Sequence, residues 1–312
     1  MFDGNLHSAQ DLRRIAERQQ ELTARVARSA PVDGVHQTAF PALALNRASV
    51  PTVCMPTVCP PCLGFVVQGR KRALLNDEVF HYDALNYLVV PVTLPMMGQV
   101  VEATTDRPFL SLRLDLDLEE IARLLLELGD RGAAPVAADR ALFVARMDEP
   151  LLDAVLRMVK LLETPEDIAV LAPAVQREIY YRVLRGELGQ RLVDLAERES
   201  GNHRIVRAVE WLKQRYAAPL RIEALADAVH MSPSTLHHRF KAVTSMSPLQ
   251  YQKHLRLHEA RRLMFVDGIE CATAGHRVGY ESPSQFSREY RRLFGAPPRV
   301  EIARLRDAGV VA

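Results

Sequence analysis

One short pattern occurs twice in this sequence, fifty residues apart, and it constrains the fold more than any other feature. SPSTLHHRFK at 232–241 is followed by SPSQFSREYR at 282–291, and Pro248 is repeated as Pro298. A serine that accepts a backbone hydrogen bond, with proline at the first helical position, is a strong helix start. The repeat therefore predicts two copies of one short helical module.

Each copy also predicts one apolar helix face, because its apolar residues are spaced i, i+4, i+7. These residues are Leu236, Phe240 and Val243 in the first copy and Phe286, Tyr290 and Leu293 in the second. Gln285 at the third helical position predicts a capping box with Ser282. Shorter helices are expected just before, at 222–229 and 269–278, each followed by a tight turn. Two helices joined by a short turn make a helix-turn-helix motif.

The opposite face of each helix carries hydroxyls, amides and cations, which suit phosphates and base edges. The predicted DNA contacts are Ser234, Thr235, His237, His238 and Lys241 in the first copy and Ser284, Gln285, Ser287, Arg288, Arg291 and Arg292 in the second. Arg288 and Arg291, with His238 and Lys241, are the main candidates. The adjacent histidines point about 100° apart on a helix, so they do not predict a metal site.

Between the copies, Ser247 to Gln250 opens another capped helix that is expected to end near Phe265. Such a helix is ~28 Å long and one turn of DNA is ~34 Å, so one chain could place both recognition helices in successive major grooves.

The repeat resembles the C-terminal domain of the AraC/XylS family of bacterial transcription regulators. The matching residues are Val278-Gly279-Tyr280, Ser282 to Phe286, Arg288, Tyr290 and Gly295 to Pro298. The chain departs from the family at Ala274-Gly275, where a bulky aliphatic residue followed by alanine is usual. Glycine costs ~1 kcal/mol of helix propensity there, which predicts that the second motif is the looser one.

Charge is distributed unevenly along the chain. From His203 onward there are 18 Lys and Arg against 10 Asp and Glu, and residues 1–202 hold 22 against 28. The basic part is where nucleic acid is expected to bind. The first fifteen residues contain no apolar run, and no stretch is apolar enough to span a membrane, so a cytoplasmic protein is expected.

Short β-like runs between residues 35 and 114 predict a small sandwich or barrel. The candidate strands are 43–45, 63–67, 72–75, 86–90, 98–101 and 109–114, with a hairpin turn at 76–78. The segments QGRK at 68–71 and EVFHYD at 78–83 resemble the cupin-like N-terminal domain of one branch of AraC-type regulators. That resemblance implies a cupin-like β-barrel whose interior holds a small effector.

Helices are expected at 7–28, 118–128, 149–162, 165–186 and 188–197. The first is interpreted as docked on its own domain rather than as a dimer arm. The apolar face of 149–162 predicts either a dimer seam, as is common in this family, or packing on the same chain's barrel. The expected organisation is α+β: a helix or arm at 1–34, a cupin-like effector and dimerisation domain at 35–200, and an all-α DNA-binding domain at 201–312.

Cys54, Cys59 and Cys62 lie close together in a proline-rich segment. They predict either a thiol sensor for a soft metal, electrophile or oxidant, or small side chains that fill gaps at the barrel rim. Their spacing matches no common zinc site. Cys271 is expected in the helical core.

The sequence shows no catalytic, cofactor or metal motif, so we expect neither an enzyme nor a bound cofactor or metal. The favoured function is sequence-specific transcription regulation. The implied partners are double-stranded DNA, a small-molecule effector, RNA polymerase and a second copy of the chain, with no membrane. The alternatives are a barrel enzyme with an accessory DNA-binding tail and an architectural DNA-binding protein without an effector.

Overall fold

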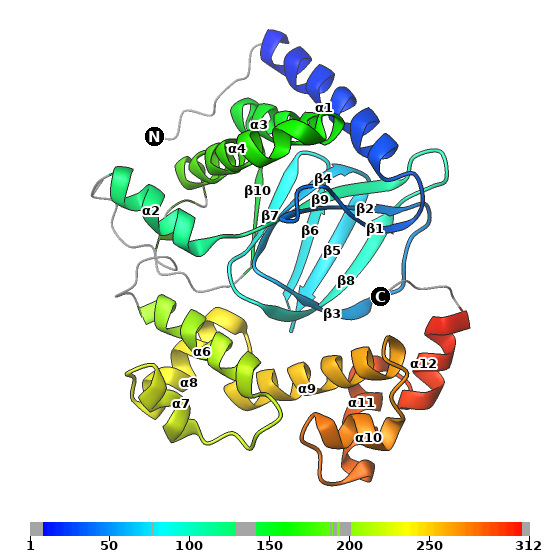
Figure 1. The fold of residues 1–312 in the computed structure, drawn as a ribbon, viewed down its shortest axis with the longest axis vertical. Helices are drawn as coiled ribbons and strands as arrows, with labels where there is room; N and C mark the ends of the chain where they lie inside the picture. Colours follow the sequence, from blue (N-terminus) through cyan, green and yellow to red (C-terminus); the bar gives the residue numbers. More distant parts are fainter. Residues whose placement is uncertain are drawn as a thin grey trace.

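The structure, a computed structural model, describes residues 9–76, 78–128, 142–187, 189, 192–193 and 201–307. Figure 1 shows a β-rich N-terminal half with helices over one end, and a C-terminal half made of helices. Of the helices expected from the sequence, the one at 188–197 lies mostly outside the described residues. No described helix has both the length and the apolar character that crossing a membrane requires.

Ten strands in the described residues form two antiparallel sheets. The six-stranded sheet has the order β1-β2-β9-β4-β7-β10, and the four-stranded sheet has the order β3-β8-β5-β6. The strands are β1 (Gly34–Gln37), β2 (Leu43–Ala48), β3 (Met55–Cys59), β4 (Cys62–Gln68), β5 (Arg70–Leu75), β6 (Glu78–Asp83), β7 (Asn86–Val90), β8 (Leu94–Glu102), β9 (Phe109–Asp115) and β10 (Phe143–Arg146). Inward side chains of both sheets join one buried apolar cluster.

The sheets do not close into the expected barrel in the described part of the chain, although the mixed fold class is confirmed. The chain passes between sheets through very short connections instead. Pro60 and Pro61 link β3 to β4, and proline has no N–H with which to continue a ladder. Gly69 alone links β4 to β5 at φ +80°, where a Cβ would lie 2.5 Å from the carbonyl oxygen of Glu102. Only glycine fits that turn without strain.

Helices cover one end of the β domain: α1 (Ala9–Ser29), α2 (Leu118–Leu128), α3 (Glu149–Lys160), a 3₁₀ turn (Leu161–Glu163) and α4 (Pro165–Arg185). α1 packs against α3 and the six-stranded sheet, and its Leu22 and Val26 are fully buried. It is therefore docked on its own domain, as expected. The apolar face of α3 packs within the same chain, mainly on α1 and α4, which agrees with the second of its two interpretations: Leu152, Val155 and Val159 are buried there.

Seven helices follow in the described C-terminal half. They are α6 (Gly201–Arg215), α7 (Ile222–Ala228), α8 (Pro233–Thr244), α9 (Pro248–Phe265), α10 (Cys271–Arg277), α11 (Pro283–Phe294) and α12 (Pro298–Asp307). α9 runs beneath β3 and connects the two motifs (Figure 1). Its start is fixed by a complete capping box, in which Ser247 and Gln250 each accept a hydrogen bond from the other's backbone N–H.

Specific contacts join the two halves. The Tyr251 hydroxyl on α9 donates to the Thr93 carbonyl over 2.6 Å, and this phenol is fully buried. Arg261 donates to the carbonyl of Pro56 in β3 over 3.3 Å, and the Asn76 amide donates to the Ser245 carbonyl. The C-terminal half therefore packs directly on the four-stranded sheet and its turns.

Candidate nucleic-acid interface

Both motifs are built by the same local interactions. The side chains of Ser232 and Ser282 accept from the backbone N–H three residues on, at 3.2 and 3.3 Å, and so start α8 and α11. The preceding turns need a positive φ, which His230 adopts at +54° in the first motif and Gly279 at +91° in the second. His230 lies two positions before the N-cap residue Ser232, and Gly279 lies three positions before the N-cap residue Ser282. The second turn is thus one residue longer.

The predicted apolar faces form the cores of the motifs. Leu236, Phe240 and Val243 are fully buried in α8, as are Phe286 and Tyr290 in α11, whereas Leu293 is half-buried. This packing fixes the rotation of each recognition helix, so the opposite face points away from the protein.

The structure places the predicted DNA contacts on the outward faces of the two recognition helices. Ser234, Thr235, His237, His238, Lys241, Ser284, Gln285, Arg288, Arg291 and Arg292 are exposed, and Ser287 is half-buried. Hydroxyls and donor-rich cations on one accessible face are the chemistry that phosphate and base-edge contacts require. Among the residues described, no group of three or more His, Cys, Asp and Glu could hold a metal.

The predicted capping box of the second motif is wrong. Gln285 donates its backbone N–H to Ser282, but its side-chain amide turns to Glu289 at 3.2 Å instead of returning to the cap. Glu289 lies one turn further along the same helix and is half-buried, so it is the nearer acceptor. An amide committed to Glu289 is less free to bind a base.

Glu289 is an acid on the recognition helix that the sequence interpretation overlooked. It also accepts from Lys253 of α9 at 3.0 Å and from the Tyr280 hydroxyl at 2.8 Å. Burial acts to raise the pKa of Glu289, but these hydrogen bonds outweigh it and hold the pKa below its ordinary value. Its charge is therefore engaged inside the domain and ties α11 to α9.

Arg256 is a further residue that the sequence did not reveal. Its guanidinium donates to the carbonyls of Tyr216, Ala217 and Ala218 in the turn that follows α6, and to Gly279 in the second turn. These distances run from 2.7 to 3.1 Å. One side chain on α9 thus connects the first motif's supporting helix to the second motif's turn, which fixes the spacing of the two recognition helices.

Gly275 explains the departure from the family pattern. A Cβ there would lie 3.0 Å from Cδ1 of Phe286, so the absence of a side chain lets α11 approach α10 closely. The corresponding residues of the first motif are Ala226 and Leu236, both fully buried. In the second motif the smaller Gly275 thus faces the larger Phe286, whereas in the first motif Ala226 and Leu236 occupy these positions.

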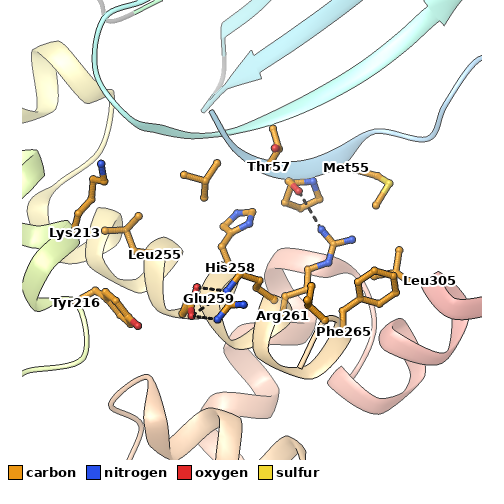
Figure 2. Close-up of a pocket in the computed structure, with 14 residues that line it drawn as sticks. Met55, Thr57, Lys213, Tyr216, Leu255, His258, Glu259, Arg261, Phe265 and Leu305 are labelled. Atoms are coloured by element: carbon orange, nitrogen blue, oxygen red, sulfur yellow. Dashed lines mark hydrogen bonds and ion pairs between the residues drawn. The ribbon is translucent and has the colours of Figure 1, made fainter. Parts of the chain in front are cut away.

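A cavity of about 660 Å³ lies between the two halves, lined by residues of β3, α6, α9, α12 and the segments that follow α6 and α9 (Figure 2). Apolar walls come from Met55, Val58 and Phe265, and Lys213 and Arg261 bring charge to its edge. A volume of this size suits a small organic ligand.

His258 is the unusual group of this cavity. Its Nε2 is buried and lacks a hydrogen-bond partner among the described atoms, and the ring stacks edge-on against Phe294 at 5.3 Å. Burial first, then the nearby His254 and Arg261, lowers the pKa of His258 to about 3. The ring is therefore neutral near pH 7.

The three clustered cysteines separate into a pair and a single residue. The sulfurs of Cys59 and Cys62 are 3.6 Å apart at the β3–β4 connection. Cys54 lies in the coil before β3 and is half-buried. Cys271 is half-buried at the start of α10 and packs against the core of the second motif, as expected.

A two-sheet domain joined to paired helix-turn-helix motifs on one spacer helix defines a two-domain transcription-regulator architecture. A family model for the AraC-type transcriptional regulator N-terminus matches residues 39–191, and a helix-turn-helix domain model matches residues 225–303. The chain belongs to the AraC family of transcriptional regulators.

Curated relatives agree with this family. The HTH-type transcriptional activator RhaS of Escherichia fergusonii is 30% identical over 165 residues, which cover 53% of this chain and 59% of RhaS. RhaS of Salmonella agona is 33% identical over 165 residues, covering 52% and 58%. The chain thus spans less than two thirds of the length of these relatives.

Solved structures share the fold. ToxT from Vibrio cholerae in a ligand-free form superposes with a TM-score of 0.54 at 9% identity, covering 84% of this chain and 97% of ToxT. ToxT with an unsaturated fatty acid bound gives 0.52 at 8% identity, covering 87% and 97%. At such identities the likeness shows the fold alone.

Proposed function

We propose that this protein binds double-stranded DNA sequence-specifically and regulates transcription, with α8 and α11 as its two recognition helices. The observation that carries the proposal is the pair of exposed, cation-bearing faces held at a fixed spacing by α9 and Arg256. An 18-residue helix is ~27 Å long, which suits major grooves ~34 Å apart on one side of a duplex.

Arg288 tests this proposal most directly. Arg288→Ala removes an exposed guanidinium from α11, and loss of a base contact should cost ~1–3 kcal/mol and relax discrimination at one position. The duplex is first selected from a random pool by the full-length protein, and its affinity is then measured in gel shifts at several salt concentrations. If Arg288 contacts only phosphate, all sequences weaken alike and the salt slope falls.

Arg123→Ala is the matched control, because this exposed arginine lies on α2 in the β domain. It should leave the affinity unchanged. An Arg288→Ala protein that binds like the parent would refute the assignment of α11 as a base-reading helix.

A small effector belongs to the same proposal. The sequence placed it inside the barrel, but the cavity between the halves offers space bounded by both β3 and α9. A ligand there would contact both halves and so favour one of their arrangements over another, which is the linkage that regulation needs. An acceptor or donor on that ligand would also satisfy Nε2 of His258.

Oleate is a suitable first probe, because the similarly folded ToxT has been solved with an unsaturated fatty acid. We expect it to raise the melting temperature of the full-length protein. Val266 is exposed and lines the cavity, so Val266→Trp should block that shift without disturbing the core. An oleate effect that survives in Val266→Trp would place the ligand elsewhere.

The remaining partners complete the proposal. We expect a homodimer and contact with RNA polymerase in the cytoplasm, and regulation rather than catalysis as the role of the β domain. Light scattering of the purified protein tests the dimer, and metal analysis with turnover assays tests the alternative of a barrel enzyme.

A further inference from the structure

Cys59 and Cys62 bracket two prolines, so the sequence reads Cys-Pro-Pro-Cys across the connection between the two sheets. Cys59 ends β3 opposite Leu94, and Cys62 begins β4 opposite Val90. Their sulfurs lie 3.6 Å apart, and a disulfide bond is ~2 Å long. A small movement at this connection would therefore join them.

The hydrogen bond between the two thiols gives their sulfurs different pKa values. The hydrogen bond from Cys62 is the largest influence that lowers the pKa of Cys59, and the cations Lys71 and Arg113 add to it against the effect of burial. The hydrogen bond to Cys59 and burial raise the pKa of Cys62. Cys59 is thus the sulfur that forms a thiolate first, and thiolates are the reactive form. It is also the more exposed of the two.

The strand that carries Cys59 also contacts the DNA-binding half. At the other end of β3, Met55 packs on the core of the second motif, and the Pro56 carbonyl accepts from Arg261 of α9. The five-residue strand β3 therefore connects the thiol at its one end to contacts with α9 and the second motif at its other end.

We propose that Cys59 and Cys62 are a dithiol that a hydroperoxide converts to an intramolecular disulfide, and that β3 passes the change to α9 and the DNA-binding half. The proposal goes beyond the proposed function because it adds a redox input. Only its expected effect on DNA affinity rests on the proposed function.

The chemistry uses one hydroperoxide for each disulfide. The Cys59 thiolate attacks the terminal peroxide oxygen, the O–O bond breaks, and the alcohol or water leaves with a proton. Cys59 is then a sulfenic acid. The Cys62 thiol attacks this sulfur, the S–S bond forms as the S–O bond breaks, and the hydroxide leaves as water with the proton from Cys62. Two thiols are oxidised and one peroxide is reduced.

The prolines direct the resulting movement. Each fixes its own φ, so Pro60 and Pro61 give the connection few ways to absorb the approach of the sulfurs. β4 lies between β7 and β9 in the six-stranded sheet, whereas β3 is an edge strand paired only with β8 in the described sheet. The edge strand is less constrained, so we expect β3 to move, and with it the contacts of Met55 and Pro56.

The oxidation is tested on the reduced full-length protein with hydrogen peroxide, followed by alkylation with iodoacetamide and peptide mass spectrometry. Wild type and the matched control Cys54→Ser should lose alkylation at Cys59 and Cys62 together and regain it with dithiothreitol. Cys62→Ser should accumulate a Cys59 sulfenic acid that dimedone traps, and Cys59→Ser should form neither product. Persistent alkylation of both thiols in the wild type would overturn the proposal, as would methylglyoxal adducts at Cys59 without any peroxide-dependent disulfide.

Hydrogen exchange tests the transmission. In oxidised wild type, exchange should change in β3 and in the part of α9 near Arg261, and Cys59→Ser treated alike should show no change. Affinity for the selected duplex should shift several-fold in parallel. Unchanged exchange in β3 and α9, or unchanged affinity, would overturn the transmission. If neither the reduced nor the oxidised protein bound a duplex, the proposed function would be contradicted. Hydrogen exchange in β3 and α9 would still show whether oxidation changes these elements.

Discussion

The two helix-turn-helix motifs share a plan but differ in what supports them. The first motif belongs to the same buried cluster as the β domain, through Phe240 and Tyr251. The second has a separate core around Phe286 and Tyr290. The two copies of the repeat therefore have different packing environments. The first packs on the β domain, and the second packs mainly on α9.

Their outward faces differ as well. The first presents His237, His238 and Lys241, and the second presents three arginines. Arginine gives planar, bidentate contacts to phosphate and guanine, whereas lysine acts as a point charge. From this difference we expect the second motif to contribute more to base discrimination and the first more to coupling with the β domain.

The largest effects should come from truncating the two cores. Phe240→Ala and Phe286→Ala should each cost about 3–5 kcal/mol. Because Phe240 packs edge-on against Tyr251, which bonds to Thr93, its loss should lower hydrogen-exchange protection in α8 and in the β domain. Loss of Phe286 should lower it in α10, α11 and α12 alone. Equal loss of protection in the β domain of both variants would remove the distinction between the motifs.

Arg256 tests whether the motifs are held together. Arg256→Met removes the side-chain donor of the Ala217 and Gly279 carbonyls, whereas the Tyr216 and Ala218 carbonyls still accept from Gln252. We expect a cost of about 2–3 kcal/mol in urea unfolding. Arg262→Met on the same helix is the control, since Arg262 is exposed and its pairs with Glu259 and Asp267 should contribute under about 1 kcal/mol. Similar losses in both variants would deny Arg256 a special role.

Acid should weaken the side of α9 that faces the second motif. The folded pKa of His258 is about 3, below the ~6.5 of an unfolded histidine, so the unfolded state binds more protons between these values. Stability is then complete above pH ~6.5 and falls as the pH drops, by about 2 kcal/mol at pH 5. Urea unfolding at pH 5 and 7 measures the slope. His258→Phe should flatten it, and exposed His276→Gln should not.

The smallest effect concerns Gly275. Gly275→Ala gains helix propensity but crowds Phe286, and we expect a net loss of about 1 kcal/mol from overpacking. Adding Phe286→Leu reproduces the Ala226 and Leu236 pair of the first motif and should recover part of the loss. Thermal unfolding of both variants decides this, and a stabilised single variant would show that Phe286 gives way freely.

Local signals in the sequence were sufficient for much of the fold. The Ser-Pro pairs predicted the first residues of α8, α9 and α11, and short β-like runs between turns located β7 and β9. The strands β3 and β10 were not predicted, because neither has a strong pattern of its own. β10 has only four residues, and β3 contains Pro56. They exist through pairing with β7 and β8, distant in the chain.

The same limit applies to the candidate sites. Exposure of Arg288 and Lys241 followed from helical periodicity alone, whereas the roles of Arg256 and Glu289 depend on carbonyls and donors supplied by other helices. The closeness of Cys59 and Cys62 was visible in the spacing, but their mutual orientation was not, because it depends on a connection that changes sheets. Periodicity describes one element, and these contacts join several.

The hydroxyl of Tyr251 also limits how the two halves can rearrange. Sliding one half over the other would break its bond to Thr93 and leave a buried carbonyl without a donor, at a cost of roughly 1–3 kcal/mol. Rotation about that point keeps the bond intact while displacing the far end of α9. A signal from the β domain should therefore tilt α11 by a larger arc than α8, as a lever moves furthest at the end remote from its fulcrum.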